Sequence, residues 1–175
     1  MAEYTHLTSE AVHALIGNYD IGDLTDVSPM PGGQANSSFQ IKAGRGHYIL
    51  SVCDEKNKDE IDCLCRVLEY LAEHQFPTSR LIRPADGRRF ISYDGKPVYL
   101  KAFMKGEVIS ELNAEMMVQV GRAMANLHAV EPLEVLPKQF PYGLAYFKEL
   151  YAAGLNHGFV DWLKARQAWL SDNLD

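Results

Sequence analysis

The sequence predicts an α+β fold, in which a small antiparallel sheet with one long helix is followed by helices alone. Three observations support this prediction. Strand-like alternation of apolar and polar residues recurs up to about residue 103, the clearest helical period lies within that part at residues 57–75, and only helical patterns follow Gly106. The change of pattern places a boundary between a sheet lobe and a helical lobe near residues 104–112.

The helices of the sheet lobe are predicted from caps and apolar periods. Residues 8–18 begin with the N-cap candidates Thr8 and Ser9 and carry an apolar stripe (Val12, Leu15 and Ile16). Residues 57–75 present one continuous apolar face, and Pro77 is expected to end this second helix. The members of that face are Ile61, Leu64, Cys65, Leu68 and Leu71.

The strands are predicted from alternation and turn residues. Residues 37–42 and 48–52 are joined by a glycine-containing turn, and residues 25–31 precede them as an edge strand because of their two prolines. Residues 90–93 and 98–103 flank Asp94-Gly95, which is a strong hairpin signal.

Helical patterns fill the rest of the chain. Asn113 is the expected cap of a helix that ends near His128, with Met117, Val120, Met124 and Leu127 on one face. Two further amphipathic stretches cover residues 144–153 and 159–170.

Composition excludes several classes of function. The 175 residues are 47% hydrophobic and carry 17 Lys+Arg against 23 Asp+Glu, a net charge of −6. There is no basic field for a nucleic acid, no apolar run near the roughly 18 residues of a membrane span, and no secretory signal at the N-terminus. Three cysteines without a CxxC pair fit free thiols in the cytoplasm and make a metal site improbable.

The segment Gly32-Gly33-Gln34-Ala-Asn36 is a candidate phosphate-binding loop. Paired glycines let the backbone approach an anion closely and direct N–H groups at it. Taken alone, the pair is more often a plain β-turn. The segment is neither a Walker loop nor a dinucleotide fingerprint, because no helix follows and the GK[ST] ending is absent.

Five stretches, in order, resemble the aminoglycoside phosphotransferase and choline kinase group of the protein-kinase-like superfamily, and within it the homoserine kinases. They are Gly33-Gln-Ala-Asn36-Ser-Ser-Phe39, Gly46-His-Tyr-Ile-Leu-Ser51, Leu68-Glu-Tyr-Leu-Ala-Glu-His-Gln-Phe-Pro77, residues 94–106 and Val120-Gly-Arg-Ala-Met-Ala-Asn-Leu-His128. The resemblance runs over about residues 1–154.

The resemblance implies a kinase-like N-lobe over residues 1–105, with the sheet and its helix C on the nucleotide side. Residues 106–175 would then begin an incomplete helical C-lobe. It further implies ATP as the phosphoryl donor, with Mg²⁺, and a small-molecule alcohol such as homoserine as acceptor. ATP would lie between the glycine loop and a hinge at residues 100–104. The implied nucleotide-binding residues are Gly32, Gly33, Gln34, Asn36, Ser37, Ser51, Lys101, Phe103 and Met104.

The sequence departs from the usual kinase phosphate clamp. Kinases place a lysine on the third strand and pair it with a glutamate of helix C. Here those positions fall on Ser51 and Leu64. The homoserine kinases resemble this chain in having a Thr or Ser at this position of the strand. Lys42 and Lys56 are candidates to replace the missing lysine of the clamp. Lysines of this kind are, however, more commonly solvated residues of the surface.

No residue of this chain is assigned as catalytic. Family members transfer phosphate with an H-[GA]-D-x-x-x-x-N loop, whereas His157-Gly158 is followed by Phe159, and Asp161 comes too late. The loop and the Mg²⁺ ligands are expected in a missing C-terminal part, so we expect the 175-residue chain alone to be inactive.

Two alternatives stay open. The chain could be a truncated, inactive kinase-like module that binds nucleotide or a partner chain, and the exposed helix faces of its incomplete C-lobe would favour self-association. It could also be an α+β domain whose likeness to kinases is only architectural.

Overall fold

The computed structural model describes residues 5–31 and 36–136, together with residues 146, 149, 166 and 169. The chain divides into two compact units, Met1–Glu134 and Val135–Asp175, and every element described below belongs to the first. The lobe boundary at residue 105 stays a prediction. The predicted helices at 144–153 and 159–170 lie outside the described residues apart from the four isolated positions.

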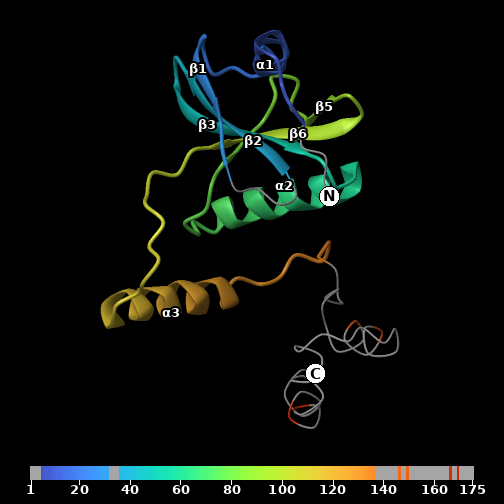
Figure 1. Cartoon of the computed structure of the whole chain (residues 1–175). Coiled ribbons are helices and arrows are strands. Elements are labelled where there is room, and N and C mark those ends of the chain that lie inside the picture. The colour runs from blue at the N-terminus through green and yellow to red at the C-terminus, as the bar shows by residue number, and fades with distance from the viewer. Residues whose placement is uncertain are drawn as a thin grey trace. The chain divides into compact units, whose positions relative to one another are not determined.

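An antiparallel sheet forms the centre of the first unit, as the sequence predicts, and it has six strands (Figure 1). The order of the strands across the sheet is β1-β2-β3-β6-β4, and β5 also pairs with β6. The strands are β1 (Leu24–Pro29), β2 (Asn36–Ala43), β3 (Gly46–Cys53), β4 (Leu81–Ile82), β5 (Ile91–Tyr93) and β6 (Lys96–Ala102). Pro29 ends the edge strand β1, where its missing N–H removes no essential ladder bond.

The three helices are α1 (Ser9–Ile16), α2 (Lys58–Glu73) and α3 (Ala114–His128). The predicted N-caps Thr8 and Asn113 are confirmed. The Thr8 side chain accepts from the Ala11 N–H, and Asn113 caps α3 in the same way. Asn57 caps α2 and forms a capping box with Glu60, which satisfies the exposed N–H groups of the first turn.

The predicted end of α2 at Gln75, before Pro77, is wrong by two residues. The helix ends at Glu73, and Gln75 adopts a left-handed conformation with φ of 57°. The Gln75 N–H donates to the Ala72 carbonyl and the Phe76 N–H donates to the Leu71 carbonyl. These two bonds make a Schellman motif, so a hydrogen-bonded cap ends the helix before the proline is reached.

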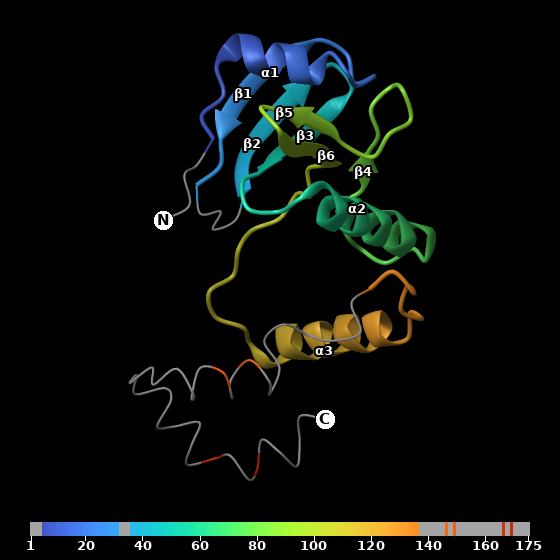
Figure 2. The same ribbon diagram turned by 90° about the vertical axis from the view of Figure 1, so that its right-hand side faces the viewer.

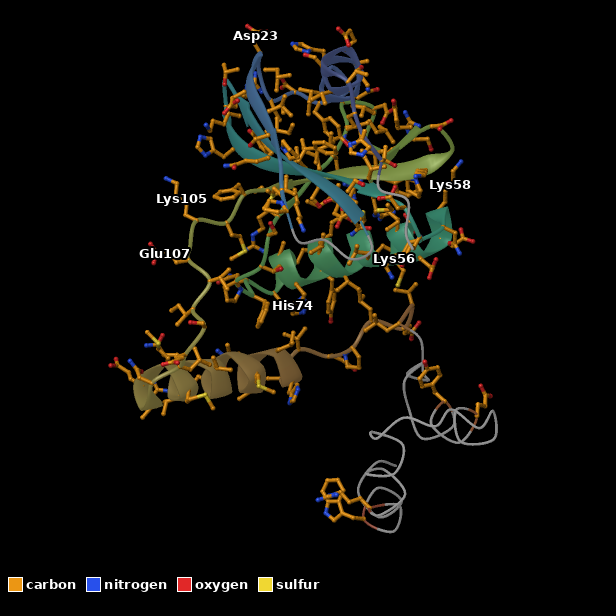
Figure 3. The ribbon with its side chains drawn as sticks, viewed as in Figure 1. Asp23, Lys56, Lys58, His74, Lys105 and Glu107 are labelled. Atoms are coloured by element: carbon orange, nitrogen blue, oxygen red, sulfur yellow. The ribbon has the colours of Figure 1, made fainter. Side chains whose placement is uncertain are left out.

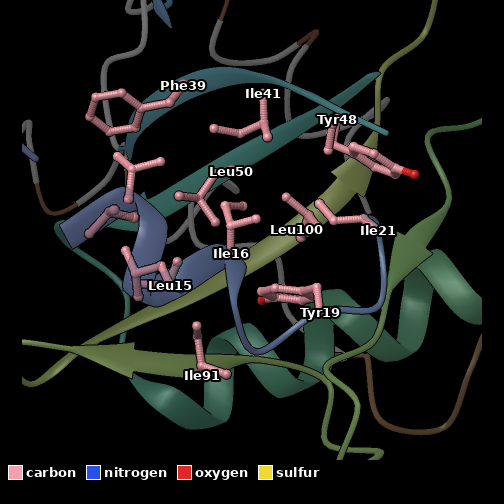
Figure 4. Packing of buried hydrophobic residues seen from close by; sticks show 14 residues of the cluster. Leu15, Ile16, Tyr19, Ile21, Phe39, Ile41, Tyr48, Leu50, Ile91 and Leu100 are labelled. Atoms are coloured by element: carbon pink, nitrogen blue, oxygen red, sulfur yellow. The ribbon is translucent and has the colours of Figure 1, made fainter. Parts of the chain in front are cut away.

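The sheet buries two different clusters on its two faces. On one face, α1 packs over a large apolar cluster centred on Ile41, Leu50 and Leu100, all 0% exposed (Figure 4). On the other face, α2 contributes Ile61 and Cys65 to a smaller cluster (Figure 2). These are called the α1 face and the α2 face below.

The strand that the sequence does not predict is β4. It has only two residues and pairs with Leu100 and Lys101, so it occupies the part of the β6 edge that β5 leaves free. A strand this short has no measurable alternation. The hairpin of β5 and β6 is confirmed, and its turn has positive φ at both Asp94 (48°) and Gly95 (76°), which suits the twist of paired strands.

The apolar stripe of α3 is exposed. Met117, Val120, Met124 and Leu127 are 40–56% exposed, and none of the residues of α3 is buried. Among the described residues, no helix is long and apolar enough to cross a membrane.

One buried polar group in the α1-face cluster has no partner. The Tyr19 side chain is 6% exposed, and its hydroxyl makes no hydrogen bond with the described residues (Figure 4). Burial raises the pKa of Tyr19, which keeps the hydroxyl neutral. A buried hydroxyl without a partner costs stability.

We therefore predict that Tyr19→Phe raises the free energy of unfolding by about 1 kcal/mol, because it removes the unpaired hydroxyl and keeps the ring. Urea denaturation measures this change. The matched control is Tyr93→Phe, at a half-buried residue that packs against the same cluster. Unlike Tyr19, Tyr93 does not have a buried hydroxyl that lacks a hydrogen-bond partner. The control should change stability by less than about 0.5 kcal/mol. A loss of stability in Tyr19→Phe would show that the hydroxyl has a partner.

Candidate nucleotide site

The predicted site residues lie at the ends and centre of three adjacent strands. Asn36 and Ser37 begin β2, Ser51 lies in β3, Lys101 lies in β6, and Phe103 and Met104 follow β6. Gly32, Gly33 and Gln34 lie outside the described residues. At the edge of that segment the Asn36 Oδ1 atom is buried and accepts no hydrogen bond within the described part of the chain.

Strand alternation separates these residues between the two faces. Ser51 lies between Leu50 and Val52, which both belong to the α1-face cluster, so its side chain points to the α2 face. Lys101 follows Leu100 and lies on the α2 face as well. Ser37 is on the opposite face, so the structure brings together the side chains of Ser51 and Lys101 but not that of Ser37.

Ser51 forms part of a row of hydroxyl groups across three strands. It is 1% exposed, and it lies opposite Ser38 of β2 and Tyr99 of β6. The oxygen atoms of Ser51 and Ser38 are 3.3 Å apart. Burial raises the pKa of Tyr99, and its hydrogen bond with Ser51 partly opposes this effect. The row is neutral and satisfied within the protein.

Helix α2 covers this region with apolar side chains. Leu64 and Leu68 pack against the cluster that contains Tyr99 and Cys53. Leu64, which the resemblance places where kinases have a glutamate, is thus part of a hydrophobic contact.

The carboxylates of α2 pair with arginines instead. Glu69 binds the Nε atoms of Arg83 at 2.6 Å and Arg89 at 2.8 Å, and Asp62 binds Arg66 and Arg89. Burial raises the pKa of Glu69, but the hydrogen bonds from the two arginines outweigh it and hold that pKa below its usual value. This network joins α2 to the segment between β4 and β5.

Lys101 is a half-buried cation without an acidic partner. Its Nζ lies 5.7 Å from the centroid of the Tyr99 ring. No ion pair or hydrogen bond to its ammonium occurs among the described residues. Burial lowers the pKa of Lys101, and the neighbouring Cys53 only partly opposes the shift.

The last residue of the predicted hinge has an N–H without a partner among the described residues. The Ala102 N–H donates to the Arg80 carbonyl at 2.8 Å, and the Phe103 N–H donates to the His47 carbonyl at 3.0 Å. Met104 makes no hydrogen bond with the described residues, and its side chain is 55% exposed. Of the predicted hinge residues, Met104 is therefore the one whose N–H is available to a ligand.

The structure contains a buried ion pair, Asp54 with Lys96, that the sequence did not predict. It lies at the other end of these strands. The Asp54 side chain is 3% exposed and accepts from the Lys96 ammonium at 2.7 Å, the Thr5 hydroxyl at 2.5 Å and the Ser37 hydroxyl at 2.7 Å. Burial raises the pKa of Asp54, but these hydrogen bonds and the Lys96 charge outweigh it, so the pKa lies below its usual value. No local signal could have paired groups that are 42 residues apart.

Comparison with known families shows which family this chain belongs to. The family model described as "Phosphotransferase enzyme family" matches residues 26–175. The chain belongs to this phosphotransferase family. Homoserine kinases of Sinorhizobium fredii and Xanthobacter autotrophicus are 30% and 26% identical to it, over 73% and 99% of the chain. The matched regions are 40% and 56% of those relatives, so the chain spans about half their length.

Solved structures agree on the fold. A spectinomycin phosphotransferase in complex with ADP and spectinomycin superposes with a TM-score of 0.61 at 14% identity, over 94% of this chain and 55% of its own. An aminoglycoside phosphotransferase from Alicyclobacillus acidocaldarius gives a TM-score of 0.60 at 12% identity, over 95% of this chain and 51% of its own. The fold is thus that of a protein-kinase-like N-lobe, which confirms the predicted fold class.

The described residues do not fit a metal site by themselves. No group of three or more His, Cys, Asp or Glu side chains is close enough to hold an ion in that part of the chain. Cys53, Cys63 and Cys65 are not joined by a disulfide bond.

We predict that Lys96→Met lowers the free energy of unfolding by about 2–3 kcal/mol, because it leaves the buried Asp54 carboxylate without its counter-charge. The loss should be smaller than the ~3–5 kcal/mol of a fully buried pair, since the Lys96 side chain is 33% exposed. Urea denaturation provides the measurement.

The control for this variant is Lys42→Met. Lys42 pairs with Asp26 at the same distance of 2.7 Å, but both side chains are about half exposed, at 44% and 50%. Its loss should stay below about 1 kcal/mol. Equal losses in the two variants would contradict the view that burial makes the Asp54 pair important.

Proposed function

We propose that this chain is the nucleotide-binding part of an ATP-dependent phosphotransferase that phosphorylates a hydroxyl of a small amino acid or amino alcohol, such as homoserine. The observation that carries this proposal is the family match over residues 26–175, which includes the candidate site and all of the sheet except the first two residues of β1. The acceptor is supported by relatives named homoserine kinase, among them one from Pseudomonas aeruginosa that is 26% identical over 85% of the chain.

In the proposed complex, adenine binds beside the strand that leads into Met104. The Met104 N–H is the free donor there, and Phe103 provides an adjacent aromatic ring. The predicted binding residues Gly32, Gly33, Gln34, Asn36 and Ser37 are proposed to approach the phosphates through the backbone. The Ser37 hydroxyl already donates a hydrogen bond to Asp54, so Ser37 would bind the phosphates through its main chain.

The chemistry of transfer is proposed to depend on residues outside this chain. Phosphoryl transfer needs a proton acceptor for the alcohol and Mg²⁺ at the phosphates. The sequence contains no H-x-D-x-x-x-x-N motif. We therefore propose that the 175-residue chain binds nucleotide but does not turn over, and that the protein acts in the cytoplasm.

The second candidate is an inactive kinase-like module that binds nucleotide or a partner chain. It is supported by the resemblance, which places Ser51 and Leu64 at the positions of the usual clamp, and by the packing of Leu64 into a hydrophobic cluster. The exposed apolar side chains of α3 would then favour self-association.

The DNA sequence downstream of the Asp175 codon separates the two candidates. An open frame that encodes the missing motif allows a direct assay of MgATP-dependent homoserine phosphorylation, and a stop codon or the absence of transfer favours the inactive module.

We predict that ATP and ADP raise the melting temperature of the chain, because a ligand that binds only the folded state stabilises it by about 2.7 kcal/mol at 100 times its Kd. Met104→Pro should raise the Kd of both nucleotides at least about tenfold and so reduce the rise in melting temperature, since proline has no N–H to donate. Differential scanning fluorimetry and calorimetric titration measure both quantities.

The matched control is Met104→Ala, which changes the same side chain but keeps the N–H. It should bind nucleotide within about twofold of the wild type, a difference well below 1 kcal/mol. Both variants should melt at the wild-type temperature without ligand, because the Met104 N–H has no partner among the described residues. Failure of the wild-type chain to bind any adenine nucleotide would contradict the proposed function.

A further inference from the structure

The α2 face lacks the lysine that kinases use to bind nucleotide phosphates. That lysine belongs on the third strand, where this chain has Ser51. Ser51 is neutral, 1% exposed and already engaged with Ser38 and Tyr99. If the phosphates of a nucleotide approach this face, their charge needs another cation.

The other lysines near this region are unsuitable. Lys96 lies on the α1 face and is committed to Asp54. Lys42 is paired with Asp26 on the neighbouring edge strand. Lys56 is exposed to solvent in the loop that precedes α2 (Figure 3). The arginines that join α2 to the segment after β4 are paired with Glu69 and Asp62.

Lys101 is in the right position to replace the missing lysine. In the register of β3 with β6, Lys101 lies opposite Ile49 and Tyr99 lies opposite Ser51. Lys101 is therefore a diagonal neighbour of Ser51 on the same face, about 7–8 Å away by strand geometry. A lysine side chain can cover most of that distance.

The direction of the Lys101 side chain supports this role. Its Nζ lies over the Tyr99 ring, so the side chain leans back along β6 toward the row that contains Ser51 rather than toward Met104. The Tyr99 ring is 3% exposed and is packed against α2 residues, including Leu64, so it is a fixed support for the ammonium.

The charge of Lys101 is also uncommitted. Its half-buried ammonium has no carboxylate partner within the described residues, and burial lowers its pKa. A cation held in this way is less stable than a solvated or paired one. An anion that arrives at the α2 face would restore the missing interaction.

We propose that Lys101 is the phosphate-binding cation of this protein, and that a lysine on β6 has replaced the usual lysine on β3. This inference rests on the proposed nucleotide-binding function. It assigns the Lys101 side chain to the β-phosphate or γ-phosphate, while the main chain of Met104 holds the adenine.

The test compares ADP with adenosine, which has no phosphate. Calorimetric titration of the 175-residue chain gives Kd for both ligands in the wild type, in Lys101→Met and in the control Lys42→Met. Lys101→Met should raise the Kd of ADP at least about tenfold, equal to about 1.4 kcal/mol, and leave that of adenosine within about twofold. Lys42→Met should change neither. Salt should weaken ADP binding to the wild type more than to Lys101→Met.

Each other result overturns the inference in a recognisable way. ADP binding by Lys101→Met within twofold of the wild type would exclude a phosphate contact, and equal losses for ADP and adenosine would place Lys101 in the adenine pocket. If the wild type binds neither ligand, the proposed function fails together with the inference. Melting without ligand checks the fold of the variant, and Lys101→Gln serves as a second neutral variant with the same expected losses.

Discussion

The antiparallel pairing of β3 with β6 is the constraint on which the rest of the molecule depends. It joins two segments about 50 residues apart, Tyr48–Val52 and Val98–Ala102, at the centre of the sheet. Both strands are buried on both faces, so a slip of one residue would turn the slipped strand over and move either Leu50 or Leu100 out of the α1-face cluster. The same slip would move Ser51 or Lys101, whichever lies on that strand, away from α2. The register that builds the core therefore also selects the side chains of the candidate site.

The charges of the α2 face follow from what covers it. Helix α2 presents Leu64 and Leu68 to the sheet and uses its carboxylates, Asp62 and Glu69, to hold arginines from the segment after β4. Consequently no acidic group of α2 neutralises a lysine on the sheet. Among the described residues, this leaves Lys101 as a positive charge without a carboxylate partner, beside the row of hydroxyl groups that contains Ser51.

The opposite end of the strands is organised by a different kind of interaction. Asp54 lies directly after β3 and collects hydrogen bonds from Thr5, Ser37 and Lys96. These groups come from the N-terminal segment and from the first residues of β2 and β6. A single buried carboxylate thus ties the start of the chain to the end of the sheet, next to the predicted glycine loop. Such a group is stable only when all its partners are present, which makes this end of the sheet sensitive to single substitutions.

The sequence by itself determined those features that depend on neighbours along the chain. Helix caps at Thr8, Asn57 and Asn113 and the turn at Asp94-Gly95 use contacts within a few residues, so their patterns are readable before folding. Ser51 and Lys101 became candidates through the family resemblance. Only the tertiary structure decided that their side chains share one face while the Ser37 side chain lies on the other, that the Met104 N–H has no partner among the described residues, and that β4 fills the edge of β6. Those facts depend on the register between distant strands, which the alternation of each strand alone does not contain.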